Sequence, residues 1–311
     1  MSPMPLETLV RTLGEHLQAE DGQHGYLLVD PMLREPLADI DLLASGCEVF
    51  PIPIDLPQLD EDQWPRLIKL KPSAVEVLSA SVAMALSEQS TAERESRAGM
   101  AIGGWLRSAA EPRALVRHLQ ALMLPVEPRV GRRYLRLADR RVFEWLWPVF
   151  SPLQRRAWLG QITQWWRLDR RGELALVTAE SVESADVHGE ALHLTAPQWA
   201  RLHDCELAQQ MLRGWSSFAE LLPTDYVRQT ERALRSVRSL GLTESADIVL
   251  MSAYQLQIHP DLCNHPRVAE LVRMAKSSDM PLHEALAEIP DPEGWDRIRH
   301  ELTADGLPET N

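Results

Sequence analysis

The residues that could do chemistry in this chain are few and widely spaced. His259, Cys263 and His265 form a His-x-x-x-Cys-x-His cluster of imidazole and thiol groups, which are zinc ligands. The spacing matches no standard zinc module, and no fourth ligand is evident beside it. We therefore interpret the cluster as a junction between a loop and a helix that begins at Pro266, and we predict no metal site.

Thiol and carboxylate catalysis have little more support. His203 and Cys205 flank Asp204, but neighbouring residues of a helix point in different directions, so His203 is poorly placed to activate the Cys205 thiol. Asp30 and Asp139 each end an apolar segment and could form a paired-carboxylate site if the fold brought them together.

Motifs for nucleotide or acyl chemistry are missing from the sequence. It contains no Walker phosphate loop, no dinucleotide fingerprint and no Gly-x-Ser-x-Gly elbow. We therefore expect no catalytic residues and no cofactor. The alternative is a hydrolase with an unrecognised carboxylate or Cys/His site.

Charge is unevenly distributed along the 311 residues, which net −13. Basic residues number 7 against 17 acids in residues 1–100, 14 against 5 in residues 101–172, and 11 against 23 in the remainder. All 14 basic residues of the middle block are Arg, and six of the ten Trp fall in it. The acidic total disfavours binding to nucleic acid or to a membrane surface.

Arg and Trp together suit planar, bidentate and cation–π contacts, which either lock a polar core or recognise a partner. As a core, Arg136 and Arg141 would pair with Asp30 or Asp139, and Trp165 would fill volume beside other Trp residues. As an interface, exposed members of the block would anchor a partner protein. The residues predicted to bind the partner are Trp105, Arg107, Arg140, Arg141 and Trp166. Charge reversal at the three Arg should then weaken binding without unfolding the protein.

Hydrophobic periodicity predicts an α/β (α+β) lobe with a mixed sheet, followed by an all-α lobe. We place the first domain at residues 1–190 and the second at 195–311, with a polar linker at 180–190. The expected strands are 26–30, 47–52, 67–70, 100–106 and 134–139, with a hairpin over 161–177 that turns at Gly172. The expected helices of the first lobe are 6–17, 73–88, 111–123 and 142–150, with a loop at 87–95. Helices of the second lobe are expected from Thr195, over 227–240 and 244–258, and after Pro266, Pro281 and Pro292.

The expected compartment is the cytoplasm. The three Cys are odd in number and far apart, which argues against a disulfide framework. No apolar run is long enough to span a membrane, and the N-terminus lacks the features of a secretory signal peptide.

Several segments, in order, resemble the effector chaperones, or adaptors, of the bacterial type VI secretion system. The shared motifs are a Tyr-x-Leu-x-Asp-Pro strand at 26–31, a Pro-x-Leu-x-x-Leu element at 65–70, a Gly-Trp stretch at 104–105 with His-Leu at 118–119, and the Gly-x-Ile-x-x-Trp and Asp-x-x-Gly hairpin at 160–172. The family's Leu-Arg-Phe-Tyr-Asp-Pro-Arg-Val-Leu signature is similar to residues 135–143. Ala138 and Arg140 replace its Tyr and Pro, while Arg136, Asp139 and Arg141 are retained.

This resemblance implies that the protein is not an enzyme and that its function is carried by protein–protein interaction. A chaperone of this family binds a cognate toxic effector in the cytoplasm and promotes its loading onto the VgrG spike. It also implies that Asp30, Arg136, Asp139 and Trp165 form the structural motif of the adaptor lobe. The expected partners are thus the effector and VgrG, with no nucleic acid and no membrane.

Overall fold

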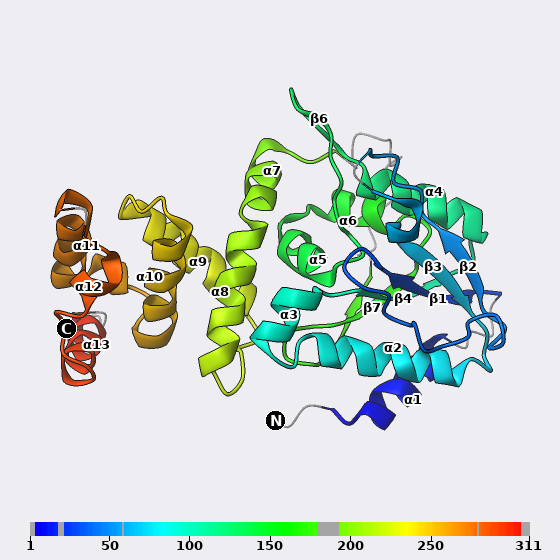
Figure 1. Ribbon diagram of the computed structural model, residues 1–311, viewed down its shortest axis with the longest axis horizontal. Coiled ribbons are helices and arrows are strands. Elements are labelled where there is room, and N and C mark those ends of the chain that lie inside the picture. Colours follow the sequence, from blue (N-terminus) through cyan, green and yellow to red (C-terminus); the bar gives the residue numbers. More distant parts are fainter. Residues whose placement is uncertain (1–3, 18–21, 58, 179–192, 279, 306–311) are drawn as a thin grey trace, which may run out of the picture. The chain divides into compact units, whose positions relative to one another are not determined.

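The computed structural model describes residues 4–17, 22–57, 59–178, 193–278 and 280–305 (Figure 1). The strands of the main sheet are β1 (His24–Val29), β2 (Glu48–Pro51), β3 (Arg66–Leu70), β4 (Ile102–Ser108), β7 (Gln164–Leu168) and β8 (Leu174–Val177). The helices that accompany them are α1 (Leu6–Leu17), α2 (Val75–Glu88), α3 (Ala92–Ala98), α4 (Pro112–Met123), α5 (Arg140–Leu146), α6 (Pro152–Leu159) and α7 (Ala196–His203).

The main sheet has six strands in the order β2-β3-β1-β4-β7-β8, and every strand pairing in it is antiparallel. The predicted strands at 26–30, 47–52, 67–70 and 100–106 correspond, in that order, to β1, β2, β3 and β4. Strands β1 and β4 are the two central strands of the sheet. The predicted hairpin over 161–177 corresponds to β7 and β8, and Gly172 turns it with a φ of 74°. The predicted class, an α+β lobe followed by a helical region, is confirmed.

Both faces of the sheet are covered by helices because its central strands are apolar on both sides. On β1, Tyr26 and Leu28 belong to one core cluster, while Leu27 and Val29 belong to another. The first cluster includes side chains of α4, α5 and α6, and the second includes those of α1 and α2. The result is a three-layer arrangement of helices, sheet and helices (Figure 1).

The glycine pair in β4 forms a β-bulge rather than a nucleotide-binding turn. Leu28 pairs with Gly104, but the next residue, Val29, pairs with Ile102, so Gly103 is the extra residue. A Cβ at Gly103 would lie 2.7 Å from the carbonyl oxygen of Ala138. The glycine therefore lets the segment before α5 approach the sheet closely.

Two predicted segments differ from the structure. Residues 134–139 form no strand, because two of their amides bond locally, from Leu137 to the Leu135 carbonyl at 2.6 Å and from Asp139 to the Arg136 carbonyl at 2.9 Å. Residues 87–95 are not a continuous loop, because Thr91 caps α3 by accepting a hydrogen bond from the amide of Arg94 at 3.1 Å. Alternation in the first segment and polarity in the second gave the wrong secondary structure.

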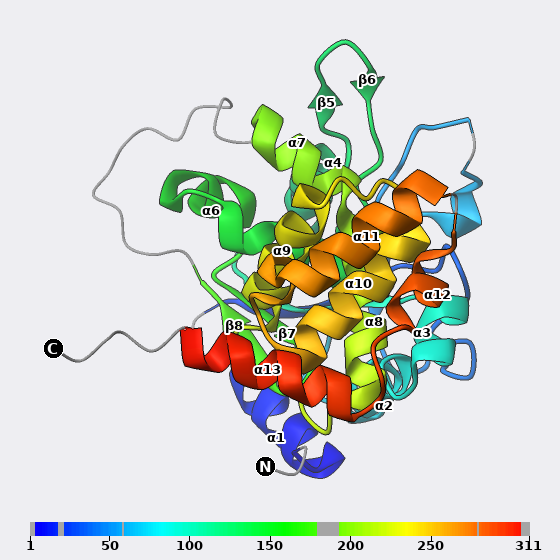
Figure 2. The ribbon, with the colours of Figure 1, turned by 90° about the vertical axis from the view of Figure 1, so that its left-hand side faces the viewer.

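A short hairpin, which the sequence did not predict, follows α4 in the chain and projects from the first unit (Figures 1 and 2). It consists of β5 (Val126–Glu127) and β6 (Gly131–Arg132), paired antiparallel as a separate two-stranded sheet. At its base, the amide of Arg133 donates to the Pro125 carbonyl at 2.9 Å.

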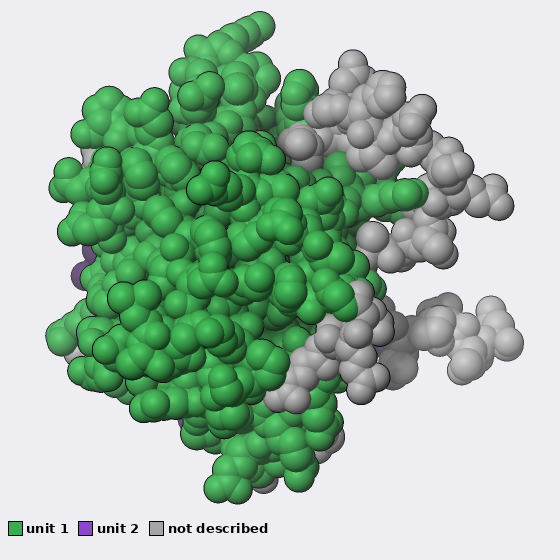
Figure 3. Space-filling view, turned by 90° about the vertical axis from the view of Figure 1, so that its right-hand side faces the viewer, with its two compact units in different colours: residues 1–203 green, residues 204–311 purple. Residues whose placement is uncertain are grey.

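The chain divides into two compact units, residues 1–203 and 204–311 (Figure 3). Helix α7 belongs to the first unit, where it packs on α5. The Trp145 indole donates to the Arg201 carbonyl at 2.7 Å, and the Arg201 guanidinium donates to the Trp145 carbonyl at 2.6 Å. Division at residues 190–195 would separate α7 from this partner, and the expected linker at 180–190 lies outside the described residues.

The described part of the second unit is helical throughout. Its helices are α8 (Cys205–Phe218), α9 (Tyr226–Ser239), α10 (Ser245–Ile258), α11 (Pro266–Ser278), α12 (Leu282–Leu286) and α13 (Glu293–Asp305). They enclose a core that includes Val237, Met251 and Leu271. None of the helices described in either unit combines the length and hydrophobicity of a membrane-spanning segment.

Candidate interaction site

The Arg-rich segment around the start of α5 builds a chain of buried ion pairs. From one end to the other, it consists of Asp30, Arg136, Asp139, Arg141, Glu95, Arg170 and Glu144, each within 4 Å of the next. The four carboxylates are at most 4 % exposed. Alternating charges therefore tie together β1, α3, α5 and the turn between β7 and β8.

Local structure sets the geometry of this chain. Asp139 is the N-cap of α5 and accepts a hydrogen bond from the Arg141 amide at 3.1 Å, while its carboxylate also receives the Arg141 guanidinium at 2.6 Å. Asp30 follows β1 and accepts from the Met32 amide at 2.9 Å and from Arg136 at 2.7 Å. The predicted pairing of Arg136 and Arg141 with these two aspartates is thus present in the structure.

The two aspartates differ in pKa. Burial raises the pKa of Asp30 above its ordinary value, although the Arg136 charge opposes the shift. Burial also acts to raise the pKa of Asp139, but the hydrogen bonds and charge of Arg141, with help from Arg136, bring it below the ordinary value. Because guanidinium and amide groups occupy these carboxylates, the pair forms a structural lock, and we infer no acid–base role for it.

A second buried ion pair lies beside the first chain. Arg140 donates to Glu88 at 2.9 Å and to the carbonyl oxygens of Ala85 and Ile102, at 2.5 Å and 3.2 Å. Glu88 also accepts from the amide of Ala101 at 2.8 Å. Burial raises the pKa of Glu88, and the charge of Arg140 acts against that shift. The pair joins the end of α2 to β4 and α5.

The residues expected to bind a partner lie mostly in the interior. Trp105 and Arg140 are 0 % and 3 % exposed, and the Trp105 indole donates to Ser81 at 2.9 Å. Trp166 is 8 % exposed and stacks on His16, with ring centroids 4.5 Å apart. These three side chains have almost no surface to offer a partner. We correct their predicted role accordingly, because the folded core already uses them.

The other members of the predicted sets divide between core and boundary. Arg141 is 13 % exposed at its side chain and belongs to the ion-pair chain, and Arg107 is half-buried on β4. Trp165 is 1 % exposed, and its indole donates to the Gly103 carbonyl at 3.2 Å. Trp165 therefore supports the β-bulge, as expected of a structural motif residue.

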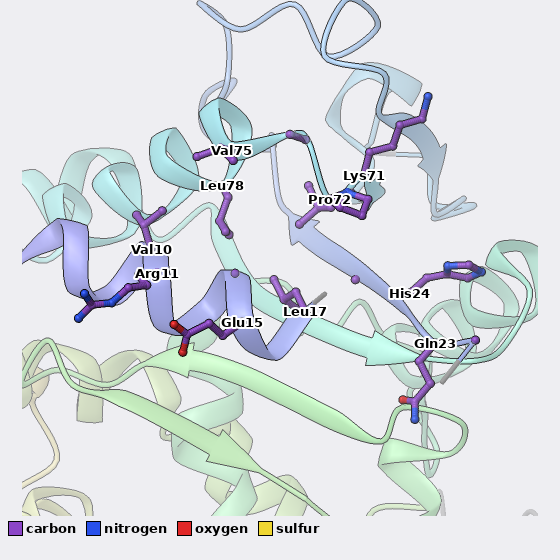
Figure 4. A pocket seen from close by; sticks show the side chains of 15 residues that line it. Val10, Arg11, Glu15, Leu17, Gln23, His24, Lys71, Pro72, Val75 and Leu78 are labelled. Atoms are coloured by element: carbon purple, nitrogen blue, oxygen red, sulfur yellow. The ribbon is translucent and has the colours of Figure 1, made fainter. Parts of the chain in front are cut away.

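A groove between α1 and α2 encloses a cavity of about 680 Å³. Its walls are α1, the start of β1, the end of β3 and the first turn of α2. In Figure 4, Leu78 points from α2 toward α1, and Val10 and Leu17 point from α1 toward α2. The inner wall is therefore apolar.

The charged residues of the groove lie at its rim. Arg11, Glu15 and Lys71 point away from the space between the helices (Figure 4). Val75, in the first turn of α2, is 57 % exposed. Gly14 leaves the middle of the α1 wall without a side chain, and a Cβ there would meet nothing closer than Leu78 Cδ2 at 3.8 Å. The site suits an apolar segment with polar flanks, and its volume is typical of ligand pockets, about 300–1,000 Å³.

With this geometry established, comparison with known proteins gives one match. Residues 25–157 match the family described as Domain of unknown function (DUF4123). No curated protein and no solved structure gives a match.

The matched segment contains most of the buried carboxylates described above and one side of the groove. It includes Asp30, Glu88 and Glu95 together with the whole of α5. It also contains the β3 and α2 walls of the groove, whereas α1 precedes it. The segment thus carries most of the buried charges of the ion-pair chain, with Arg170 outside it, and two walls of the groove.

The Cys and His residues that resembled ligand or nucleophile sets have separate partners. Cys263 lies 3.2 Å from the Gln255 amide oxygen, and His265 lies 2.8 Å from Glu301. His203 contacts Glu127 at 3.1 Å. Within the described residues, no three His, Cys, Asp or Glu side chains are grouped closely enough to hold a metal ion.

Proposed function

We propose that this chain is an effector-specific adaptor of the bacterial type VI secretion system. In this role it binds a cognate toxic effector in the cytoplasm and promotes loading of that effector onto the VgrG spike, without catalysing a reaction. The match of residues 25–157 carries the proposal, because four of the five motifs that resemble effector chaperones begin within those residues.

The structure explains why those motif residues suit a binding scaffold. The charged motif residues Asp30, Arg136, Asp139 and Arg141 form ion pairs with one another. Such a network fixes the relative positions of β1 and α5 and leaves the helix-covered exterior available for recognition. A rigid scaffold of this kind loses little conformational entropy when it binds a partner.

We place the effector contact in the groove between α1 and α2. Its occupant in this proposal is an apolar segment of the effector, which buries side chains against Val10, Leu17 and Leu78. Arg11 and Lys71 at the rim outnumber Glu15, so acidic flanks on that segment would be favoured over basic ones.

Co-purification tests the adaptor role. The chain is expressed with the product of the adjacent downstream gene and with VgrG, and the mixture is separated by size-exclusion chromatography with mass determination. A complex of defined stoichiometry is expected. If the chain runs alone while the neighbouring secretion components are present, the adaptor proposal fails, and a hydrolase activity becomes the next function to assay.

A further inference from the structure

The β5–β6 hairpin carries charges that the fold leaves unneutralised. Among the 14 Arg of residues 101–172, Arg136, Arg140, Arg141 and Arg170 are paired with buried carboxylates. Arg129 and Arg132 lie on the hairpin, are exposed, and have no carboxylate within 4 Å among the described residues. Although the chain nets −13, these two guanidinium groups are available to pair with an anionic partner.

Apolar side chains stand beside those cations. Val126 is 67 % exposed and Val130 is 53 % exposed, so neither contributes its side chain to a core. Val126 is the direct cross-strand partner of Arg132, which places the two on one face of the hairpin. The outer face therefore presents an apolar side chain beside a basic one.

The opposite face is anchored to the body of the first unit. Glu127 is 9 % exposed, receives the Arg133 guanidinium at 2.9 Å and lies 3.1 Å from His203 of α7. A two-stranded hairpin of this length is marginal on its own, so this anchor is what keeps it ordered. The projecting arm is consequently held ready in one orientation, which lowers the entropic cost of binding.

The turn at the tip places Arg where glycine is favoured. Arg129 has a φ of 69°, the only positive φ of a non-glycine residue among those described, and it follows Pro128 in a turn closed by a hydrogen bond from the Val130 amide to the Glu127 carbonyl at 3.2 Å. A type II turn normally takes glycine or asparagine at this position. A guanidinium is thus presented at the tip despite the local backbone preference.

We propose that the β5–β6 hairpin binds an acidic, extended segment of a partner protein, with Arg129 and Arg132 pairing its carboxylates and Val126 and Val130 contacting its apolar side chains. Polypeptide is favoured over nucleic acid because the chain as a whole is strongly acidic. This inference goes beyond the adaptor proposal, because it concerns a surface other than the groove and stands or falls without the effector.

A peptide-binding experiment on the full chain tests the proposal. The probe is a fluorescein-labelled peptide in which Glu alternates with Val, and anisotropy reports its affinity at low and high salt. The variant R129Q/R132Q should bind about three- to tenfold more weakly, as expected for two exposed ion pairs. The control R273Q/R297Q removes two exposed Arg from the second unit and equals the test variant in net charge.

The wild-type chain should bind the probe, bind more weakly in high salt, and ignore a matched peptide in which Lys replaces Glu. The control variant should bind as the wild type does. The proposal is overturned if the wild type does not bind the acidic peptide, if both double variants lose affinity equally, or if labelled duplex DNA binds more tightly than the peptide in a hairpin-dependent way. Circular dichroism of each variant verifies its fold, and R129G supplies a second hairpin variant with a relaxed turn.

Discussion

Arg140 and Glu88 form an ion pair 2.9 Å long in which neither side chain is more than 3 % exposed. Arg140 stands where the related signature has Pro, and it uses further N–H groups to satisfy the carbonyls of Ala85 and Ile102. This departure from the signature therefore does not leave a gap. It adds a cross-link between α2 and the segment that begins α5, beside the ion-pair chain that contains Asp139.

The substitution Arg140→Met should destabilise the first unit by up to about 3–5 kcal/mol, because it removes the buried cation of Glu88 and leaves only the more distant Arg34, at 3.6 Å, beside that carboxylate. Urea unfolding followed by circular dichroism measures the loss. The matched control is Arg113→Met on the exposed side of α4, which should change stability by no more than about 0.5 kcal/mol.

The double variant E88M/R140M distinguishes a lost charge partner from lost packing. It should recover part of the stability that Arg140→Met loses, because no unpaired charge remains. Equal losses in the single and double variants would show that lost packing, and not an unpaired carboxylate, causes the destabilisation. Charge reversal at Arg140 is likewise expected to impair folding, so it cannot serve as the clean binding test that the sequence suggested.

The ion pairs show what a sequence can predict and what it cannot. Arg136, Asp139 and Arg141 lie within six residues, so local spacing was enough to expect pairing among them and with Asp30. The partners Glu88 and Glu95 come from helices more than 40 residues away in the chain, and no local pattern links them to Arg140 or Arg170. A single sequence does not distinguish exposed from buried side chains, so the predicted interface set included Trp105, Arg140 and Trp166, which are buried.

The groove was also beyond sequence reasoning. Helices α1 and α2 each read as ordinary amphipathic or apolar helices, and a cavity depends on how far apart two such helices pack. Gly14 in the interior of α1 was the available signal, since glycine there costs helix stability without an evident turn. Its meaning emerges only when Leu78 is found opposite it.

Filling the groove should block effector binding while preserving the fold. In Gly14→Leu, the new Cβ would be in ordinary van der Waals contact with Leu78 Cδ2 at 3.8 Å and the rest of the side chain would extend into the groove that Gly14 lines, while helix propensity improves by up to about 1 kcal/mol. We expect loss of co-purification with the effector, together with unchanged or higher thermal stability.

Gly14→Ala is the matched control for that experiment. It gives the same kind of helix stabilisation but adds only a methyl group, so the effector should still co-purify. If Gly14→Leu still binds the effector, the groove is not the site of the effector contact. The adaptor role itself is tested separately, by co-purification of the wild type.

Lowering the pH should destabilise the protein through His118. Its Nε2–H donates to the Trp158 carbonyl at 2.8 Å, and burial lowers the pKa of the ring below 6.5, against the opposing effect of that hydrogen bond. The folded state therefore resists protonation, so the stability contributed by His118 is complete above pH 6.5 and falls as the pH drops toward the folded-state pKa.

Thermal unfolding of the wild type and of His118→Gln between about pH 7.5 and pH 5 isolates this contribution. Glutamine retains an N–H donor but does not titrate. The wild type should lose more stability than the variant over this range. Parallel curves would show that protonation of His118 is not coupled to unfolding.

Relaxing the hairpin turn should separate stability from binding. Because Arg129 has a φ of 69°, Arg129→Gly removes a steric cost of about 1–2 kcal/mol, partly offset by the greater entropy of glycine in the unfolded chain. We expect a stability equal to the wild type or up to about 1 kcal/mol higher, measured by urea unfolding, with weaker binding of the acidic peptide. Val130→Gly is the control, since Val130 does not have a positive φ and should gain nothing. A less stable Arg129→Gly variant would mean that the Arg129 side chain supports the hairpin, in which case its conformation reflects folding and not presentation to a partner.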